Sequence, residues 1–157
     1  MTRLLPLWAL LLVLFTSACG SSAVSDAQQM IRYSGYALRD VDTEVAPLYL
    51  AAHEAALAGS EDLNAYHVTM RPWAALEIAL RTSYSAFLAA DQALEATGEV
   101  PLLSRVACLL GSLSTVAHAL GDLELPVPQL LTQALGYAAS YTGECTEPPT
   151  PAAGAVP

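Results

Sequence analysis

The sequence predicts an all-α protein, an antiparallel up-and-down bundle of three to four helices. Apolar residues recur at spacings of three and four along most of the chain, as on one face of a helix. No segment shows the strict alternation typical of a strand. Short connections that carry Gly or Pro separate the helical stretches, and short connections favour antiparallel neighbours. We expect this bundle over residues 26–145, because a chain of 157 residues can bury one core.

The first predicted helix spans residues 26–58. Ser25 is a candidate N-cap, and Gly59 is a typical residue just beyond a helix end. Pro47 lies inside the apolar seam and removes the backbone hydrogen bond to residue 43. We therefore expect this helix to be kinked, or split in two, near residues 43–47.

The remaining helices are predicted from their prolines and glycines. Pro is tolerated in a first helical turn, and Gly marks helix ends. The predicted bounds are 60–70 for a short segment, then 72–96, 101–121 and 128–143 for three helices. In the second helix we expect one broad apolar face, made of Trp73, Leu76, Leu80, Tyr84, Phe87 and Leu94.

The chain begins with a candidate targeting segment. An apolar run over residues 4–15 follows Arg3, which is typical of a signal peptide and too short for a membrane span of roughly 20 residues. Small residues at 16–18 directly before Cys19 resemble a bacterial lipobox. The resemblance implies cleavage of residues 1–18 as a lipoprotein signal peptide and a diacylglyceryl group on the Cys19 sulfur. An ordinary secretory peptide, cut after Ala18 or near Ala23, is the alternative.

Two further segments flank the predicted bundle. Residues 19–25 are rich in Gly and Ser, and we expect them to form a lipidated tether. Residues 146–157 are rich in Pro and Ala and are predicted to be disordered. In an oxidising compartment Cys108 and Cys145 would form a disulfide, with two buried free thiols as the alternative.

The charge balance argues against nucleic acid as a partner. The formal net charge is −9, and all 6 basic residues are arginines. Binding to phosphate backbones requires clustered Lys and Arg, which this chain lacks. A polybasic patch is likewise missing as a second membrane signal, so an N-terminal lipid would have to hold the chain at the membrane alone.

The sequence predicts no catalytic site, metal site or cofactor. His53 opens a segment like the helical zinc-protease signature, but Leu57 occupies the position of the second histidine. The acidic segment 40–44 begins like a calcium loop, but Val45 stands where the turn needs glycine. Ser112 lacks the second glycine of a nucleophile elbow. We therefore predict that the protein is not an enzyme.

One stretch is a candidate binding surface, because it brings bulky side chains together in a chain of mostly small residues. These candidates are Tyr66, His67, Met70, Arg71 and Trp73. In one interpretation they plug the end of the core, and Arg71 pairs with an acidic residue. In the other they recognise a partner or an apolar ligand, since aromatic residues and Arg dominate binding hot spots.

The lipobox, the long first helix, the turn from Met70 to Trp73 and the two later cysteines together resemble small helical lipoproteins encoded in phages and prophages of high-GC bacteria. The resemblance implies no known activity and assigns no functional residue. Gly20 resembles an outer-membrane sorting signal, which implies the periplasmic face of the outer membrane in a Gram-negative host.

We therefore expect a non-enzymatic lipoprotein of the cell envelope. Its lipid would contact the membrane, and its bundle would contact an envelope protein. If the gene belongs to a phage, the expected roles are host lysis or exclusion of a second phage. A helical module that binds a small apolar ligand and a host accessory lipoprotein are the alternatives.

Overall fold

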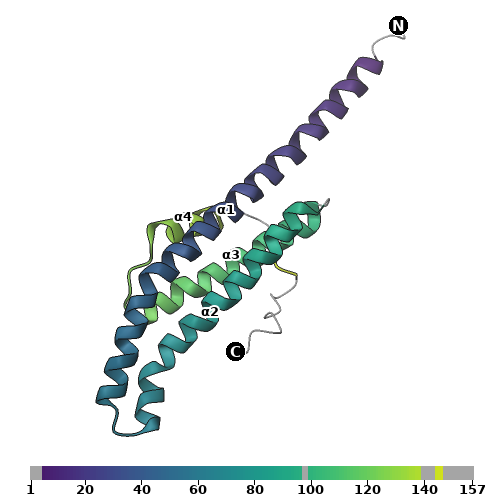
Figure 1. Ribbon diagram of the computed structural model, residues 1–157. Helices are drawn as coiled ribbons and strands as arrows, with labels where there is room; N and C mark the ends of the chain where they lie inside the picture. The colour runs from purple at the N-terminus through teal and green to yellow at the C-terminus, as the bar shows by residue number, and fades with distance from the viewer. Residues whose placement is uncertain (1–4, 97–98, 139–143, 147–157) are drawn as a thin grey trace.

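The computed structural model describes residues 5–96, 99–138 and 144–146, with side chains from Val24 onward except at 99–101. The described ranges contain four helices and no strand, so the predicted all-α bundle is confirmed. The helices are α1 (Leu5–Gly59), α2 (Leu63–Glu95), α3 (Glu99–Asp122) and α4 (Gln129–Ala138). Figure 1 shows α1, α2 and α3 packed side by side, with the short α4 against α1. The N-terminal part of α1 extends beyond the other helices (Figure 1).

Helix α1 is unbroken, so it does not split at Pro47. Pro47 and Thr43 are both exposed, and the Thr43 carbonyl that loses its backbone partner can bond to water. Val45 and Tyr49, on the inner side of the helix, pack toward α2 and hold this stretch in place. The backbone of residues 19–25, where we expected a tether, is also helical in this uncleaved chain.

Helix α2 differs from its prediction because it begins before Pro72. We expected a short segment that ends near Met70 and a new helix at Pro72, whereas α2 is continuous from Leu63 to Glu95. Asp62 caps it, since its Oδ1 accepts the Ala65 N–H at 2.7 Å. The hydrogen bond lost at Pro72 falls on the carbonyl of Val68, an exposed residue, so water can replace it.

The buried face of α2 also differs from the predicted one. Leu76 and Leu80 are buried as expected, but Tyr84 is 36% exposed. Trp73, Phe87 and Leu94 are partly buried against the core. Besides Met70, the other buried residues of α2 are small and follow spacings of four and three: Ala79, Ser83, Ala86 and Ala90. Small side chains let two helix backbones approach closely, and the most extensive contact in the bundle is the one between α2 and α3.

Helix α3 supplies the large side chains at the centre of the core. Val106, Leu109 and Leu113 have no exposed surface. Among the described residues, Leu102–Asp122 is a helix apolar and long enough to cross a membrane, but half of its most apolar window is buried inside the bundle. This burial is what a core helix of a folded domain shows.

The predicted disulfide is confirmed. Cys108, buried in α3, is bonded to Cys145, with their Cα atoms 4.7 Å apart. The residue after Cys145 strengthens the attachment, because the Thr146 N–H donates to Ser104 Oγ at 3.3 Å and the two hydroxyls lie 2.8 Å apart. The segment at 144–146 is thus fixed along the N-terminal half of α3.

Reduction of this disulfide should destabilise the protein. The bond closes a loop of 37 residues, and the chain-entropy treatment of such a loop gives about 3–4 kcal/mol of unfolding free energy. The measurement is guanidinium denaturation of the Cys19→Ser chain with and without reductant. The double variant Cys108→Ala/Cys145→Ala is the control and should ignore reductant. An equal midpoint for the oxidised and reduced chain would contradict the stabilising role of the bond.

Candidate functional site

Aromatic rings from α1 and α2 form a continuous ladder near the loop that joins these helices. The Trp73 ring meets Tyr49 edge to face at a centroid distance of 6.0 Å. Tyr49 stacks on His53 at 6.2 Å, and His53 meets Tyr66 edge to face at 5.7 Å. The Tyr66 ring in turn contacts His67 at 5.6 Å. Contacts of this kind contribute about 0.5–1.5 kcal/mol each beyond the buried area.

A hydrogen bond joins the two helices within this ladder. The Tyr66 hydroxyl and the His53 Nδ1 lie 2.8 Å apart, and both side chains are partly buried. When the imidazole carries its proton on Nε2, the Tyr66 O–H donates to Nδ1. The bond ties the last turns of α1 to the first turn of α2, so the loop end of the hairpin is held by side chains as well as by its backbone.

The five residues predicted as a binding surface have different surroundings in the structure. Met70 is 7% exposed and belongs to the interior, while Trp73 is half-buried. Tyr66 is half-buried and His67 is exposed, both within the ladder. Arg71 is exposed, and within the described ranges the acidic partner that we expected for it is not present.

Sequence reasoning missed Tyr49 and His53 as members of this site. They are four residues apart on α1, which places them on one helix face. An antiparallel hairpin that turns at residues 60–62 brings this face opposite the first turns of α2. The spacing and the turn together could have indicated the pairing of Tyr49 with Trp73.

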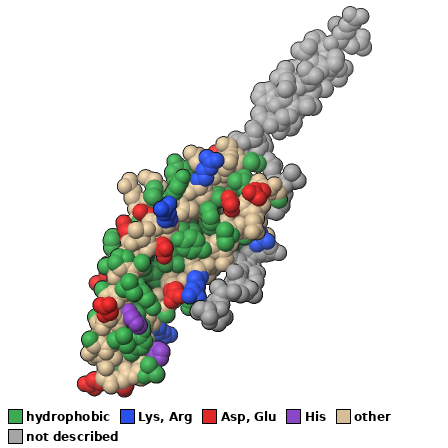
Figure 2. All heavy atoms as spheres, in the orientation of Figure 1, with side chains coloured by type: hydrophobic (Ala, Val, Ile, Leu, Met, Phe, Trp, Pro, Cys, Tyr) green, Lys and Arg blue, Asp and Glu red, His purple; other side chains and the backbone are tan. Residues whose placement is uncertain are grey.

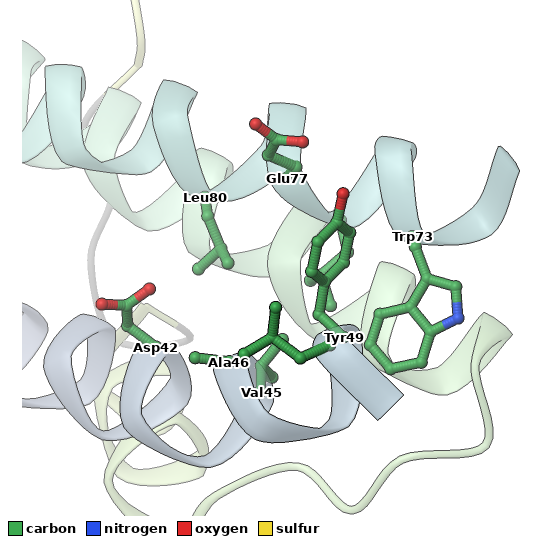
Figure 3. A pocket seen from close by; sticks show the side chains of 9 residues that line it. Asp42, Val45, Ala46, Tyr49, Trp73, Glu77 and Leu80 are labelled. Carbon is green, nitrogen blue, oxygen red and sulfur yellow. The ribbon is translucent and has the colours of Figure 1, made fainter. Parts of the chain in front are cut away.

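A cavity of about 340 Å³ lies between α1 and α2, beside the ladder. This volume is at the lower end of the range for small-molecule sites, which are mostly apolar with a few polar groups. Figure 3 shows the Asp42 side chain toward one end and Trp73 at the other, with Tyr49 and Leu80 between them. The residues that line the cavity are Asp42, Val45, Ala46, Tyr49, Leu50, Trp73, Leu76, Glu77 and Leu80.

The two carboxylates of the cavity differ in their partners. Glu77 accepts a hydrogen bond from the Arg81 guanidinium one turn further along α2, in a salt bridge. The Asp42 carboxylate makes no ion pair or hydrogen bond with the part of the chain that the structure describes. Its charge acts on a neighbour instead: burial raises the pKa of Tyr84, and the Asp42 carboxylate raises it further.

The surface around the hairpin combines apolar and acidic side chains. Figure 2 shows hydrophobic groups spread over this face, with acidic groups between them and histidines toward the loop end. The large exposed apolar side chains near the loop are Leu50, Leu57, Leu63 and Val68, each more than half exposed. Such a mixture is compatible with a protein contact, since interface cores are apolar and aromatic while their rims are polar.

Two other side chains with reactive groups, Ser112 and His118, are bonded within α3. The buried Ser112 hydroxyl donates to the Leu109 carbonyl at 2.7 Å. The His118 Nδ1 lies 2.7 Å from the Ser114 carbonyl. Among the described residues, no group of three or more His, Cys, Asp or Glu side chains could hold a metal ion. The side chain of Cys19, the predicted lipidation site, lies outside the described ones.

Comparison of the chain with protein-family models, with curated protein sequences and with solved structures gives no match. The resemblance to phage-encoded lipoproteins therefore stays a prediction.

The raised pKa of Tyr84 predicts a loss of stability in alkali. Because the folded-state pKa exceeds the unfolded value of about 10, this stability is present below about pH 10 and is lost as the pH rises through the folded pKa. The chain has no lysine to obscure the effect. In guanidinium denaturation of the Cys19→Ser chain, the midpoint should fall more between pH 8 and about pH 11 than in a Tyr84→Phe variant of that chain.

The matched control for this experiment is Tyr36→Phe, because Tyr36 is 62% exposed. This variant should lose stability with pH as the parent chain does. An identical pH dependence of the parent and Tyr84→Phe would contradict the role assigned to Tyr84.

Proposed function

We propose that this protein is a lipid-anchored lipoprotein of a bacterial cell envelope that acts by contact with another protein and not by catalysis. The observation that carries the proposal is the position of Cys19, directly after three small residues that end an apolar run.

The shape of the bundle supports a contact away from the membrane. The N-terminal end of α1 and the aromatic ladder lie at opposite ends of this helix (Figure 1). If α1 stays helical from Cys19 to His53, the two residues are about 50 Å apart at 1.5 Å per residue. The ladder, with Arg71 beside it, has the residue types that dominate binding hot spots, and we place the protein contact there.

The resemblances extend the proposal to the origin of the gene. Gly20 favours the periplasmic face of the outer membrane in a Gram-negative host. A phage-encoded lipoprotein at this place would serve in host lysis or in exclusion of a second phage. Endolysin, holin or tail genes beside this gene would support that origin, and envelope-biogenesis genes would favour a host accessory lipoprotein.

Replacement of Cys19 should abolish both processing and the protein contact. The wild-type chain in the membrane fraction should lack residues 1–18 and carry added acyl mass, because the lipid is attached to the Cys19 sulfur. Intact-mass analysis checks this, with Cys19→Ala as the test and Ser22→Ala as the matched control that keeps processing. A Cys19→Ala chain that is cleaved and membrane-bound like the wild type would overturn the lipid anchor.

The contact itself is measured by photo-crosslinking in living cells. A photoreactive residue at position 71, beside the ladder, should give one defined adduct in the lipidated chain and none in the Cys19→Ala background. The same residue at position 88, where Leu88 is 56% exposed and more than four turns further along α2, is the control and should give no such adduct. Equal adducts from both positions would contradict a contact at the ladder.

A second candidate function is the binding of a small apolar ligand. The cavity between α1 and α2 favours it, because its walls are mostly apolar and its volume of about 340 Å³ suits a small molecule. This candidate predicts saturable binding of an uncharged probe with an apolar body, such as 4-phenyl-1-butanol.

A further inference from the structure

We propose that the cavity between α1 and α2 binds a small amphiphilic cation, a molecule with an aromatic or aliphatic body and one ammonium group. The inference deepens the second candidate function and rests on it, since the body of the ligand has to enter the cavity. The apolar-ligand function does not specify the charge of the ligand, and the inference adds this charge and the side chain that recognises it.

The walls of the cavity determine the body of the ligand. Leu50, Leu76 and Leu80 line it together with the rings of Tyr49 and Trp73. Apolar area removed from water stabilises a bound molecule by roughly 25 cal/mol per Å². A volume of about 340 Å³ suits a single ring with a short chain better than a long lipid chain.

The carboxylate at one end determines the charge of the ligand. Asp42 lines the cavity but has no ion pair or hydrogen bond within the described part of the chain, and Arg39, one turn earlier, makes no salt bridge with it. Glu77 is different, because Arg81 already neutralises it. An ammonium group beside Asp42 would therefore gain a counter-charge without displacing a cation of the protein.

Two further features favour a cation over an anion. The electron-rich ring faces of aromatic side chains attract ammonium groups within about 6 Å, and Tyr49 lines the cavity between Asp42 and Trp73. The whole chain is also strongly acidic, with a formal net charge of −9. A fatty acid or another anionic amphiphile would meet an unfavourable potential at this site.

The chain carries its own reporter for this experiment. It has 2 tryptophans, and the second, Trp8, lies in the N-terminal apolar run, so a Trp8→Phe variant keeps Trp73 alone at the end of the cavity. The full-length variant in zwitterionic lipid nanodiscs is titrated with three matched probes, followed by tryptophan fluorescence. The probes are 4-phenylbutylamine, 4-phenyl-1-butanol and 4-phenylbutyrate, which share one body and differ in charge.

We expect saturable binding of the amine, roughly fivefold tighter than that of the alcohol, with the butyrate weakest. Asp42 is exposed, so Asp42→Asn should weaken amine binding roughly two- to fivefold, down to the level of the alcohol, as loss of a solvent-exposed charge pair does. The matched control is Asp91→Asn, which removes an exposed carboxylate of α2 outside the cavity and should leave the affinity for the amine unchanged.

A second pair of variants tests the location. Ala46 lines the cavity at an exposed position, so Ala46→Phe should fill the cavity and remove binding of the amine and the alcohol without disturbing the core. Ala55→Phe, at an exposed position of α1 that does not line the cavity, should leave binding unchanged. Circular dichroism of each variant verifies that the helices are intact.

Each negative result of these binding experiments would overturn a different part of the proposal. Equal affinity for the amine and the alcohol, unaffected by Asp42→Asn, would overturn the cationic ligand and leave the apolar-ligand function standing. Absence of saturable binding of all three probes up to millimolar concentration would overturn both. Binding that survives Ala46→Phe in a folded chain would place the ligand elsewhere and overturn the assignment to this cavity.

Discussion

The close approach of α2 to α3 is the constraint on which the positions of the other helices depend. Ala79, Ser83, Ala86 and Ala90 form a buried face of small side chains on α2, and the contact of α2 with α3 is the most extensive in the bundle. The Ser83 hydroxyl is buried without a hydrogen-bond partner in the described chain, which costs about 1–3 kcal/mol. The presence of Ser83 at this buried position of α2, despite this cost, indicates that its small size matters for packing. The larger Trp73 and Leu80 line the cavity beside α1, and we infer that the small face of α2 is the one packed on α3.

Much of the fold could be predicted from the sequence, because the spacing of apolar residues and the two cysteines have direct structural consequences. Gly59 marks the observed end of α1, and Cys108 and Cys145 are bonded as expected. The prolines misled the prediction of helix bounds. Pro72 removes a hydrogen bond from the carbonyl of Val68, and the exposure of Val68, which lets water replace this bond, cannot be read from the sequence alone.

The candidate site was predictable only in part. The cluster from Tyr66 to Trp73 is visible in the sequence, but its partners Tyr49 and His53 depend on the register of the hairpin. The pattern of large apolar residues also gave Tyr84 a core position, although alanines fill that role in α2. Alanine carries little signal in a chain so rich in it. The cavity and the lone charge of Asp42 are properties of the packed helices and have no signature in sequence order.

The central claim is that the small side chains of α2 set its distance from α3, and one substitution tests it most directly. Ala86 is 2% exposed, so Ala86→Leu would force the two helices apart. Guanidinium denaturation of the disulfide-bonded chain should show a loss of about 1–3 kcal/mol of unfolding free energy, the usual cost of overpacking. Ala75→Leu, at an exposed position of the same helix, should be close to neutral. An Ala86→Leu chain as stable as the Ala75→Leu chain would contradict the account.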